Sequence, residues 1–222
     1  MEKRLTRKSS LVALGGLAAA AAGWRTDDAG AGPAAVASGA VRCVLTPEMT
    51  EGPYYVPDEA VRRNITEGLP GTPLALHLTV VNASTCHAIA GAKVDIWHAN
   101  ALGVYSGVQG NTGTFMRGVQ PTNTHGLALF ETVYPGWYTG RAVHIHIKVH
   151  LGGNVVHTGQ LFFPDSLTDT AYKKAPYSSR PGRDTRNTTD AIFRNGGSRS
   201  MLKLSRSGSG YVGAISLGVH RT

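Results

Sequence analysis

Alternation of apolar and polar positions predicts several short β-strands in this chain. From Leu74 the sequence reads Leu-Ala-Leu-His-Leu-Thr-Val-Val, which is typical of a strand with one buried face. The turn residues Asn82-Ala83-Ser84 follow it. Further apolar runs predict strands over 94–97, 127–133, 144–149, 155–163 and 211–219. This spacing predicts an all-β fold, a single β-sandwich domain of mostly antiparallel strands with long loops.

One helix is expected before the last predicted strand. Asp165 or Ser166, after Pro164, is a candidate cap for a helical turn through Leu167 and Tyr172. From 172 to about 206 the periodicity is lost, and Lys, Arg, Ser, Gly and Asn predominate. That stretch is predicted to be a long surface excursion.

The amino-terminal segment has the layout of an export signal. An apolar run over 11–22, too short to span a bilayer stably, follows four basic residues, Lys3, Arg4, Arg7 and Lys8. The run from Thr6 to Leu11 resembles a twin-arginine signal with Lys8 at the second arginine position, which leaves Sec export open. A buried Ala-rich helix of the domain is the alternative.

Export fixes the expected domain boundaries and the environment of the cysteines. We expect an export signal and flexible segment over 1–37 and a secreted domain over 41–222. Two cysteines exclude a disulfide-rich miniprotein and a four-cysteine zinc site. In an oxidising compartment Cys43 and Cys86 are expected to form a disulfide, and two free buried thiols are the alternative.

The net charge of +8 is unevenly distributed. Cleavage of the signal would remove its four basic residues. The stretch 172–207 holds nine basic and two acidic residues, so that the rest of the chain is mildly acidic. A nucleic-acid partner therefore loses its support, and no membrane association is expected after signal removal. The basic stretch is either a solvated loop or a surface that attracts anionic aromatic substrates or polymers.

The strongest chemical signal is His144-Ile145-His146. Residues two apart on a strand point to the same face, so the two imidazoles project together while Ile145 faces the core. Paired neutral histidines favour a metal site, although surface or hydrogen-bonded histidines share this pattern.

Tyrosines are the candidate partners of the two histidines. No Cys lies nearby, and no acidic residue just downstream completes a facial triad, which disfavours zinc-protease and ferrous-oxygenase sites. Tyr134 and Tyr138 lie upstream, and Tyr105 follows the strand over 94–97. A phenolate is a hard anionic donor that suits ferric iron, whose charge lowers the phenol pKa.

These segments together resemble the intradiol ring-cleavage dioxygenases, which include protocatechuate 3,4-dioxygenase and catechol 1,2-dioxygenase. The resemblance runs from about Thr46 to Pro164 and is carried by Val94-Asp95-Ile96-Trp97-His98-Ala99-Asn100, Gly103-Val104-Tyr105 and Pro135-Gly136-Trp137-Tyr138-Thr139-Gly140-Arg141-Ala142-Val143-His144-Ile145-His146. The chain looks closest to the secreted, single-domain branch. The resemblance implies a β-sandwich and a mononuclear non-haem Fe(III) ion held by Tyr105, Tyr138, His144 and His146.

Two further site residues follow from the resemblance. Arg141 would steady the activated substrate ring, and Gln160 would lie near the oxygen-binding side of the iron. The alternatives are a surface ion pair for Arg141 and a plain polar strand position for Gln160. Two further alternatives stay open: Tyr105 could be an aromatic residue of a turn rather than a ligand, and Tyr134 could be the ligand in place of Tyr138.

The expected function is Fe(III)-dependent intradiol cleavage of a catechol-type aromatic diol with O2. The product would be a cis,cis-muconate-type dicarboxylic acid, formed in aromatic compound catabolism. The residues that bind the carboxylate of the substrate ring in protocatechuate enzymes have no clear counterpart in this sequence, which leaves the preferred substrate open. Alternatives are an exported β-sandwich binding module for aromatic or polymeric ligands without catalysis, and a zinc or copper protein using the same histidines.

Overall fold

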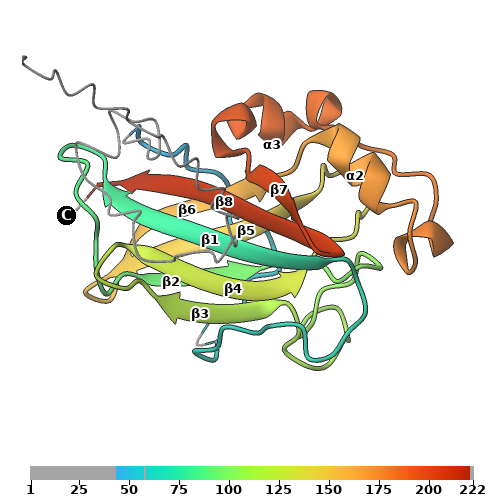
Figure 1. Cartoon of the computed structure of the whole chain (residues 1–222), viewed down its shortest axis with the longest axis horizontal. Helices are drawn as coiled ribbons and strands as arrows, with labels where there is room; N and C mark the ends of the chain where they lie inside the picture. Colours follow the sequence, from blue (N-terminus) through green and yellow to red (C-terminus); the bar gives the residue numbers. More distant parts are fainter. Residues whose placement is uncertain (1–43, 58, 221–222) are drawn as a thin grey trace, which may run out of the picture.

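Two four-stranded sheets pack face to face in the computed structural model, which describes residues 44–57 and 59–220 (Figure 1). The first sheet has the order β4 (Leu127–Val133), β1 (Pro73–Asn82), β8 (Gly210–Val219) and β7 (Lys203–Ser207). The second has the order β3 (Arg117–Pro121), β2 (Lys93–Trp97), β5 (His144–Leu151) and β6 (Asn154–Phe162). All neighbours are antiparallel except β1 and β8. The predicted all-β sandwich is confirmed.

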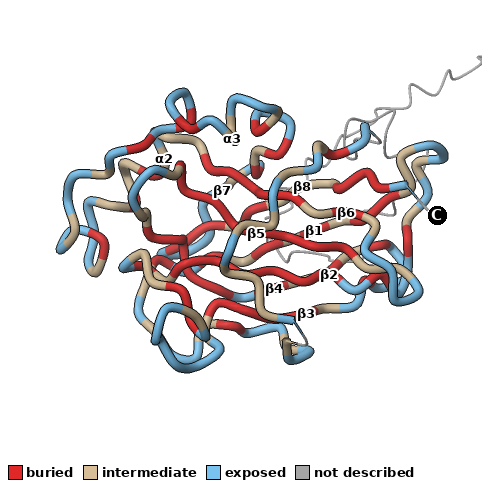
Figure 2. Tube along the Cα trace, turned by 180° about the vertical axis from the view of Figure 1, so that it is seen from behind, coloured by how far each residue is buried: buried red, intermediate tan, exposed pale blue. Residues whose placement is uncertain are grey.

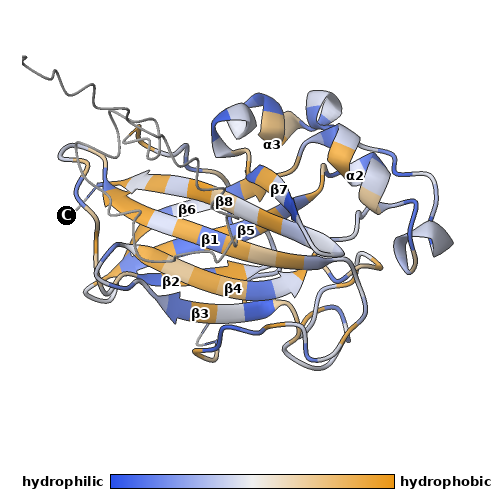
Figure 3. Cartoon of the chain, in the orientation of Figure 1, coloured by the Kyte–Doolittle hydropathy of each residue, from blue (hydrophilic) through white to orange (hydrophobic). Residues whose placement is uncertain are grey.

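Alternation along the strands builds the core between the sheets. Leu74, Leu76 and Leu78 of β1 face Ile145 and Ile147 of β5 within one buried cluster. Bands of hydrophobic and polar residues alternate along the strands (Figure 3), and buried positions follow the strands while the connecting loops are mostly exposed (Figure 2). Because Ile145 and Ile147 point into the core, the side chains on either side of them lie on the outer face of the second sheet.

Two strands were not predicted. The β3 strand begins at Arg117 and contains Gly118 and Gln120, and it forms through antiparallel pairing with β2. The β7 strand is largely exposed and, in the part of the chain that the structure describes, lies at the edge of its sheet beside β8. Both lack the apolar alternation that signals a half-buried strand, so pairing partners rather than local pattern define them.

The helix after Pro164 is confirmed as α2 (Asp165–Ala171), but the expected cap is wrong. Pro164 occupies the cap position, and among the described residues no side chain makes a cap hydrogen bond to the helix. Asp165 instead lies in the first turn, where it accepts hydrogen bonds from Arg183 and from the Asn187 N–H group.

The interpretation of 172–206 as a surface excursion is wrong in part. The segment forms short 3-10 turns at Tyr177–Ser179, Asn187–Thr189 and Gly197–Ser200, the helix α3 (Ala191–Arg194) and strand β7. Figure 1 shows α2 and α3 together beside one end of the sheets. The backbone N–H of Leu202 donates to Phe162 at 2.9 Å, which ties the segment to β6.

A segment near the start of the described chain crosses the outer face of the second sheet. Met49 N–H donates to Thr158 O at 2.9 Å, and Arg62 N–H donates to Val119 O at 3.1 Å. The face that carries His146 is therefore covered by protein. No helix within 44–57 and 59–220 is long and apolar enough to cross a bilayer.

Two sequence predictions fall outside the described residues. The export signal expected over 1–37 lies there, and so does Cys43, the expected partner of Cys86. Both stay predictions.

Candidate metal centre

Four predicted ligand residues converge at one end of β5. His144 and His146 are buried on the same face, with their Nε2 atoms 3.0 Å apart. The Oη atom of Tyr138 lies 3.1 Å from Nε2 of His144. The ring of Tyr105 lies with its centroid 5.6 Å from that of Tyr138 and 6.1 Å from that of His146.

The two tyrosine loops are held together through their backbones. Gly136 N–H donates to Asn100 O at 2.9 Å, and a Cβ atom on Gly136 would lie 2.4 Å from Ala101 O. Gly103 has a φ of +78°, and its Cβ atom would lie 2.1 Å from Trp137 O. Only glycine allows this approach. The loop that ends at Tyr105 thus packs directly on the loop that ends at Tyr138.

Tyr134, the rival to Tyr138, lies elsewhere. It is fully buried in the main core, its hydroxyl is 2.8 Å from Thr168 Oγ1, and its ring packs on Phe163 at 4.5 Å. The structure therefore brings Tyr138 to the histidines and leaves Tyr134 in the core.

Burial keeps both histidines neutral. It lowers the pKa of His144 to about 3 and that of His146 well below its usual value, and in each case nearby positive charge adds to the effect. His144 donates from Nδ1 to Ala142 O at 2.6 Å, which leaves a lone pair on Nε2. A neutral imidazole nitrogen is the form that binds a metal ion.

Burial also raises the pKa of both phenols, that of Tyr105 well above its usual value, and the charge of Arg141 opposes the increase at both. In the protein alone both phenols are therefore protonated at neutral pH. A metal cation would reverse this, because its charge favours the phenolate.

The donor atoms fit one metal ion. Two imidazole nitrogens bound to one ion at about 2.1 Å each, at right angles, lie roughly 3 Å apart, as Nε2 of His144 and His146 do. Within residues 44–57 and 59–220, the buried hydroxyl of Tyr105 and the buried Nδ1 atom of His146 have no hydrogen-bond partner at normal geometry. In the described part of the chain no three His, Cys, Asp or Glu side chains form a metal-binding group, so an ion here would take phenol oxygens.

Arg141 and Gln160 also reach the site. Nη1 of Arg141 lies 3.5 Å from Nε2 of His144, and Nη2 donates to Oε1 of Gln160. Gln160 is fully buried and lies opposite His146 in the β5–β6 register. Arg141 does form an ion pair, with Asp190, but this carboxylate is buried rather than on the surface.

Sequence reasoning missed the aromatic residues around the histidines. The Trp97 ring stacks on His146 at 4.9 Å with 5° between the planes, and Tyr55 packs on Trp97 at 4.8 Å. Tyr54 lies 4.7 Å from Tyr105. Of these residues, Trp97 could have been found from the strand pattern, because it points to the outer face of β2, opposite to Val94 and Ile96.

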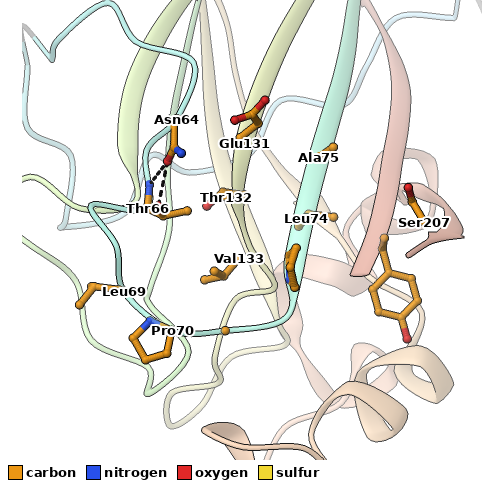
Figure 4. A pocket seen from close by; sticks show the side chains of 13 residues that line it. Asn64, Thr66, Leu69, Pro70, Leu74, Ala75, Glu131, Thr132, Val133 and Ser207 are labelled. Carbon is orange, nitrogen blue, oxygen red and sulfur yellow. Dashed lines mark hydrogen bonds between the residues drawn. The ribbon is translucent and has the colours of Figure 1, made fainter. Parts of the chain in front are cut away.

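The groove drawn in Figure 4 lies away from these residues. It has a volume of about 440 Å³ and runs past the ends of β1 and β4, between Leu69, Pro70, Glu131 and Ser207. None of the candidate site residues lines it.

Comparison with known proteins gives the same family by sequence and by structure. A family model described as Dioxygenase matches residues 50–176. An intradiol ring-cleavage dioxygenase from Tetranychus urticae is 36% identical with a TM-score of 0.77, covering 80% of this chain and 95% of that one. The dioxygenase domain of a dioxygenase carbohydrate-binding protein fusion from Streptomyces sp. SirexAA-E is 32% identical with a TM-score of 0.63, covering 80% of this chain and 99% of that one.

A curated relative is the chlorocatechol 1,2-dioxygenase of Pseudomonas putida. It is 27% identical over 135 residues, which are 51% of this chain and 52% of that protein. The match thus spans about half the length of this relative. With a family model over more than half of the chain and a relative 36% identical along most of it, the chain belongs to the intradiol ring-cleavage dioxygenase family.

Proposed function

We propose that this protein binds ferric iron through Tyr105, Tyr138, His144 and His146 and cleaves a catechol-type diol with O2 to a cis,cis-muconate-type dicarboxylic acid. The observation that carries the proposal is the convergence of two neutral imidazoles and two phenols at one point. The names of the relatives, a chlorocatechol and a catechol 1,2-dioxygenase among them, support the reaction class.

Bound at this point, ferric iron would supply a Lewis acid that fixes both oxygens of the diol. The protein supplies neutral nitrogen donors and a site closed to bulk water on the side of the second sheet. Tyr138 is partly exposed whereas Tyr105 is 4% exposed. With iron bound, Tyr138 would be a phenolate, and we therefore assign to its Oη atom the uptake of a proton from the incoming diol.

Arg141 and Gln160 supply electrostatic support. A guanidinium stays charged at any relevant pH, and Nη1 of Arg141 faces the imidazole of His144 rather than a carboxylate. A fixed positive charge at this position favours the negative charge that a deprotonated diol brings to the site. Gln160 donates from Nε2 to Thr50 O, so its Oε1 remains oriented toward Arg141.

The test is spectroscopic and chemical. Protein from iron-replete cells is expected to be coloured, because charge transfer from a phenolate to ferric iron absorbs visible light. Catechol, protocatechuate and hydroxyquinol are added without oxygen, the spectrum is recorded, and the products are identified after oxygen is admitted. A colourless protein with no iron, or diol binding without oxygen uptake, would contradict the proposal and favour a binding module.

We also propose that the protein is exported by the signal over 1–37. The basic and apolar pattern of 1–22 supports this. The amino terminus of the protein recovered outside the cytoplasm would begin after Ala22 or Ala37, as determined by mass spectrometry. Protein that stays in the cytoplasm with the segment intact would refute export.

A further inference from the structure

Asp190 joins the start of α3 to the loop that holds Arg141 and Ala142 through one buried carboxylate. Its side chain is 1% exposed. Oδ1 accepts from the N–H groups of Ile192 at 2.7 Å and Phe193 at 3.0 Å, which caps α3. Oδ2 accepts from Nε of Arg141 at 2.9 Å and from Ala142 N–H at 2.7 Å.

These contacts fix the orientation of the Arg141 guanidinium. Nε is held by Asp190, and Nη2 is held by Gln160, which is itself fixed by the carbonyl of Thr50. A guanidinium is planar, so two anchored nitrogens determine where the third one lies. The third nitrogen is Nη1, 3.5 Å from Nε2 of His144.

Asp190 remains ionised in this environment. Burial raises its pKa, but hydrogen bonds from Phe193 N–H and Ala142 N–H, together with the charge of Arg141, lower it more, so that the net pKa lies below the usual value. An ionised carboxylate that accepts four hydrogen bonds is a rigid anchor, because loss of any one donor leaves the buried negative charge less well compensated.

We propose that Asp190 is a positioning residue that holds Arg141 with Nη1 directed at the diol-binding side of His144. Through it, the short helix α3 becomes part of the support of the site. The inference rests on the proposed function, in which Arg141 faces the bound diol. The competing view is that Asp190 only caps α3 and ties that helix to the sandwich.

Two substitutions separate these roles. Asp190→Asn keeps an oxygen for the α3 N–H groups but places an amide donor against Nε of Arg141. Asp190→Ser keeps a good capping group and removes the contact with Arg141. Asp184→Asn is the matched control, because Asp184 lies in the same segment and is exposed, and it accepts from Gly140 N–H at 3.3 Å without touching Arg141.

The kinetic test uses the iron-loaded full-length protein. Asp190→Asn and Asp190→Ser are expected to lower kcat/KM by roughly tenfold or more, as loss of a partner that orients a site residue does, with iron content retained and the anaerobic catechol spectrum altered. Asp184→Asn is expected to match the unmodified protein. In an Arg141→Gln background, Asp190→Asn is expected to have less than about a twofold further effect, because the two residues act as a unit.

A second readout needs neither iron nor activity. The Nε–H resonance of Arg141 in ¹⁵N NMR spectra of the metal-free protein is identified as the signal lost in Arg141→Lys. It is expected to exchange with water slowly in the unmodified protein and at least about tenfold faster in Asp190→Ser.

The proposal is overturned if Asp190→Ser lowers the melting temperature alone, with kcat/KM and the Nε–H exchange rate unchanged. An effect of Asp190→Asn that is equally large in the Arg141→Gln background would overturn it too. Failure of the unmodified protein to cleave any diol would instead refute the proposed function, and the exchange measurement would still decide whether Asp190 holds Arg141.

Discussion

At the scale of single residues, the histidines of the site owe their orientation to different contacts. His144 is fixed by a hydrogen bond from Nδ1 to Ala142 O, the arrangement common for metal-binding histidines. His146 finds no acceptor for Nδ1 among the described residues and is fixed by stacking on Trp97. Sequence reasoning found both histidines, because two-residue spacing on a strand is a local pattern. Asp190 and the stacking of Trp97 could not be predicted this way, since each depends on a partner far away in the chain.

Substitution of each candidate phenol should separate ligands from core tyrosines. Tyr105→Phe and Tyr138→Phe are expected to lower activity by more than the roughly 10–100-fold that loss of a ligand's hydrogen-bond partner causes, and to shift or abolish the visible absorption. Tyr134→Phe is the control, because it loses only the contact with Thr168, worth about 1 kcal/mol. Unchanged colour and iron content in both site variants would refute the ligand set.

Buried histidines should also make the metal-free protein less stable in acid. Burial lowers the pKa of His98 and His157 to about 4, whereas the unfolded chain titrates near 6.5. Below pH 6.5 the unfolded state therefore takes up protons that the folded state does not, and each of these histidines lowers the free energy of unfolding by about 2 kcal/mol between pH 7 and pH 5. Burial raises the pKa of Asp95 to about 7, which acts in the opposite direction over the same range and offsets about one histidine.

Urea unfolding at pH 7, 6 and 5 measures this dependence. The free energy of unfolding is expected to fall with pH, and His157→Gln is expected to show a fall smaller by about 2 kcal/mol. A free energy that is constant or rises toward pH 5 would be inconsistent with neutral buried histidines.

At the scale of elements, the site depends on two loops more than on strands. The strands place the histidines, but the separation of the two phenols is set by the contact of Gly103 with the backbone of Trp137. Strong alternation made β1, β4, β5, β6 and β8 predictable. By contrast, β3 and β7 lack such a pattern and are defined by their pairing with β2 and β8. The segment 172–206 contains short turns whose residues pack without periodicity, so it could not be predicted either.

A methyl group between the two loops should therefore disturb the site. Gly103→Ala places Cβ 2.1 Å from Trp137 O and is expected to displace Tyr105 from Tyr138, which lowers iron content as well as stability. Gly91→Ala is the control, because its φ of +72° imposes the same backbone strain, about 1–2 kcal/mol, with nothing within 4 Å of the new atom. Equal iron content in the two variants would show that the loop contact does not position the phenols.

At the scale of the whole molecule, the basic segment 172–207 is partly neutralised and partly structural. Arg183 is nearly buried and pairs with Asp165 and Asp169, and Arg186 also pairs with Asp169. Arg180 lies over the ring of Trp137 and donates to its carbonyl at 2.9 Å. The composition showed that this segment is basic but not which contacts its basic side chains make, because ion pairing depends on which acidic side chains the fold places nearby.

The pairing of Cys43 with Cys86 is a further prediction for the exported protein. A closed loop of about 43 residues is worth on the order of 4 kcal/mol in the chain-entropy model. Reduction is therefore expected to lower the melting temperature by several degrees, and Cys43→Ser is expected to do the same without further sensitivity to reductant. Peptide mapping checks the bond, and two free thiols in the oxidised protein would exclude it.

The position of β8 also has a consequence for how the protein is made. This strand lies between β1 and β7, and its parallel register joins Leu74 to Tyr211 and Asn82 to Val219. The first sheet cannot close until residues near 219 have left the ribosome. Long-range pairing of this kind forms late and slowly, so the nascent chain exposes the apolar edge of β1 throughout most of its synthesis. Chaperone engagement during translation should therefore persist at least until the codons for β8 have been read, and ribosome profiling of chaperone-bound chains measures this.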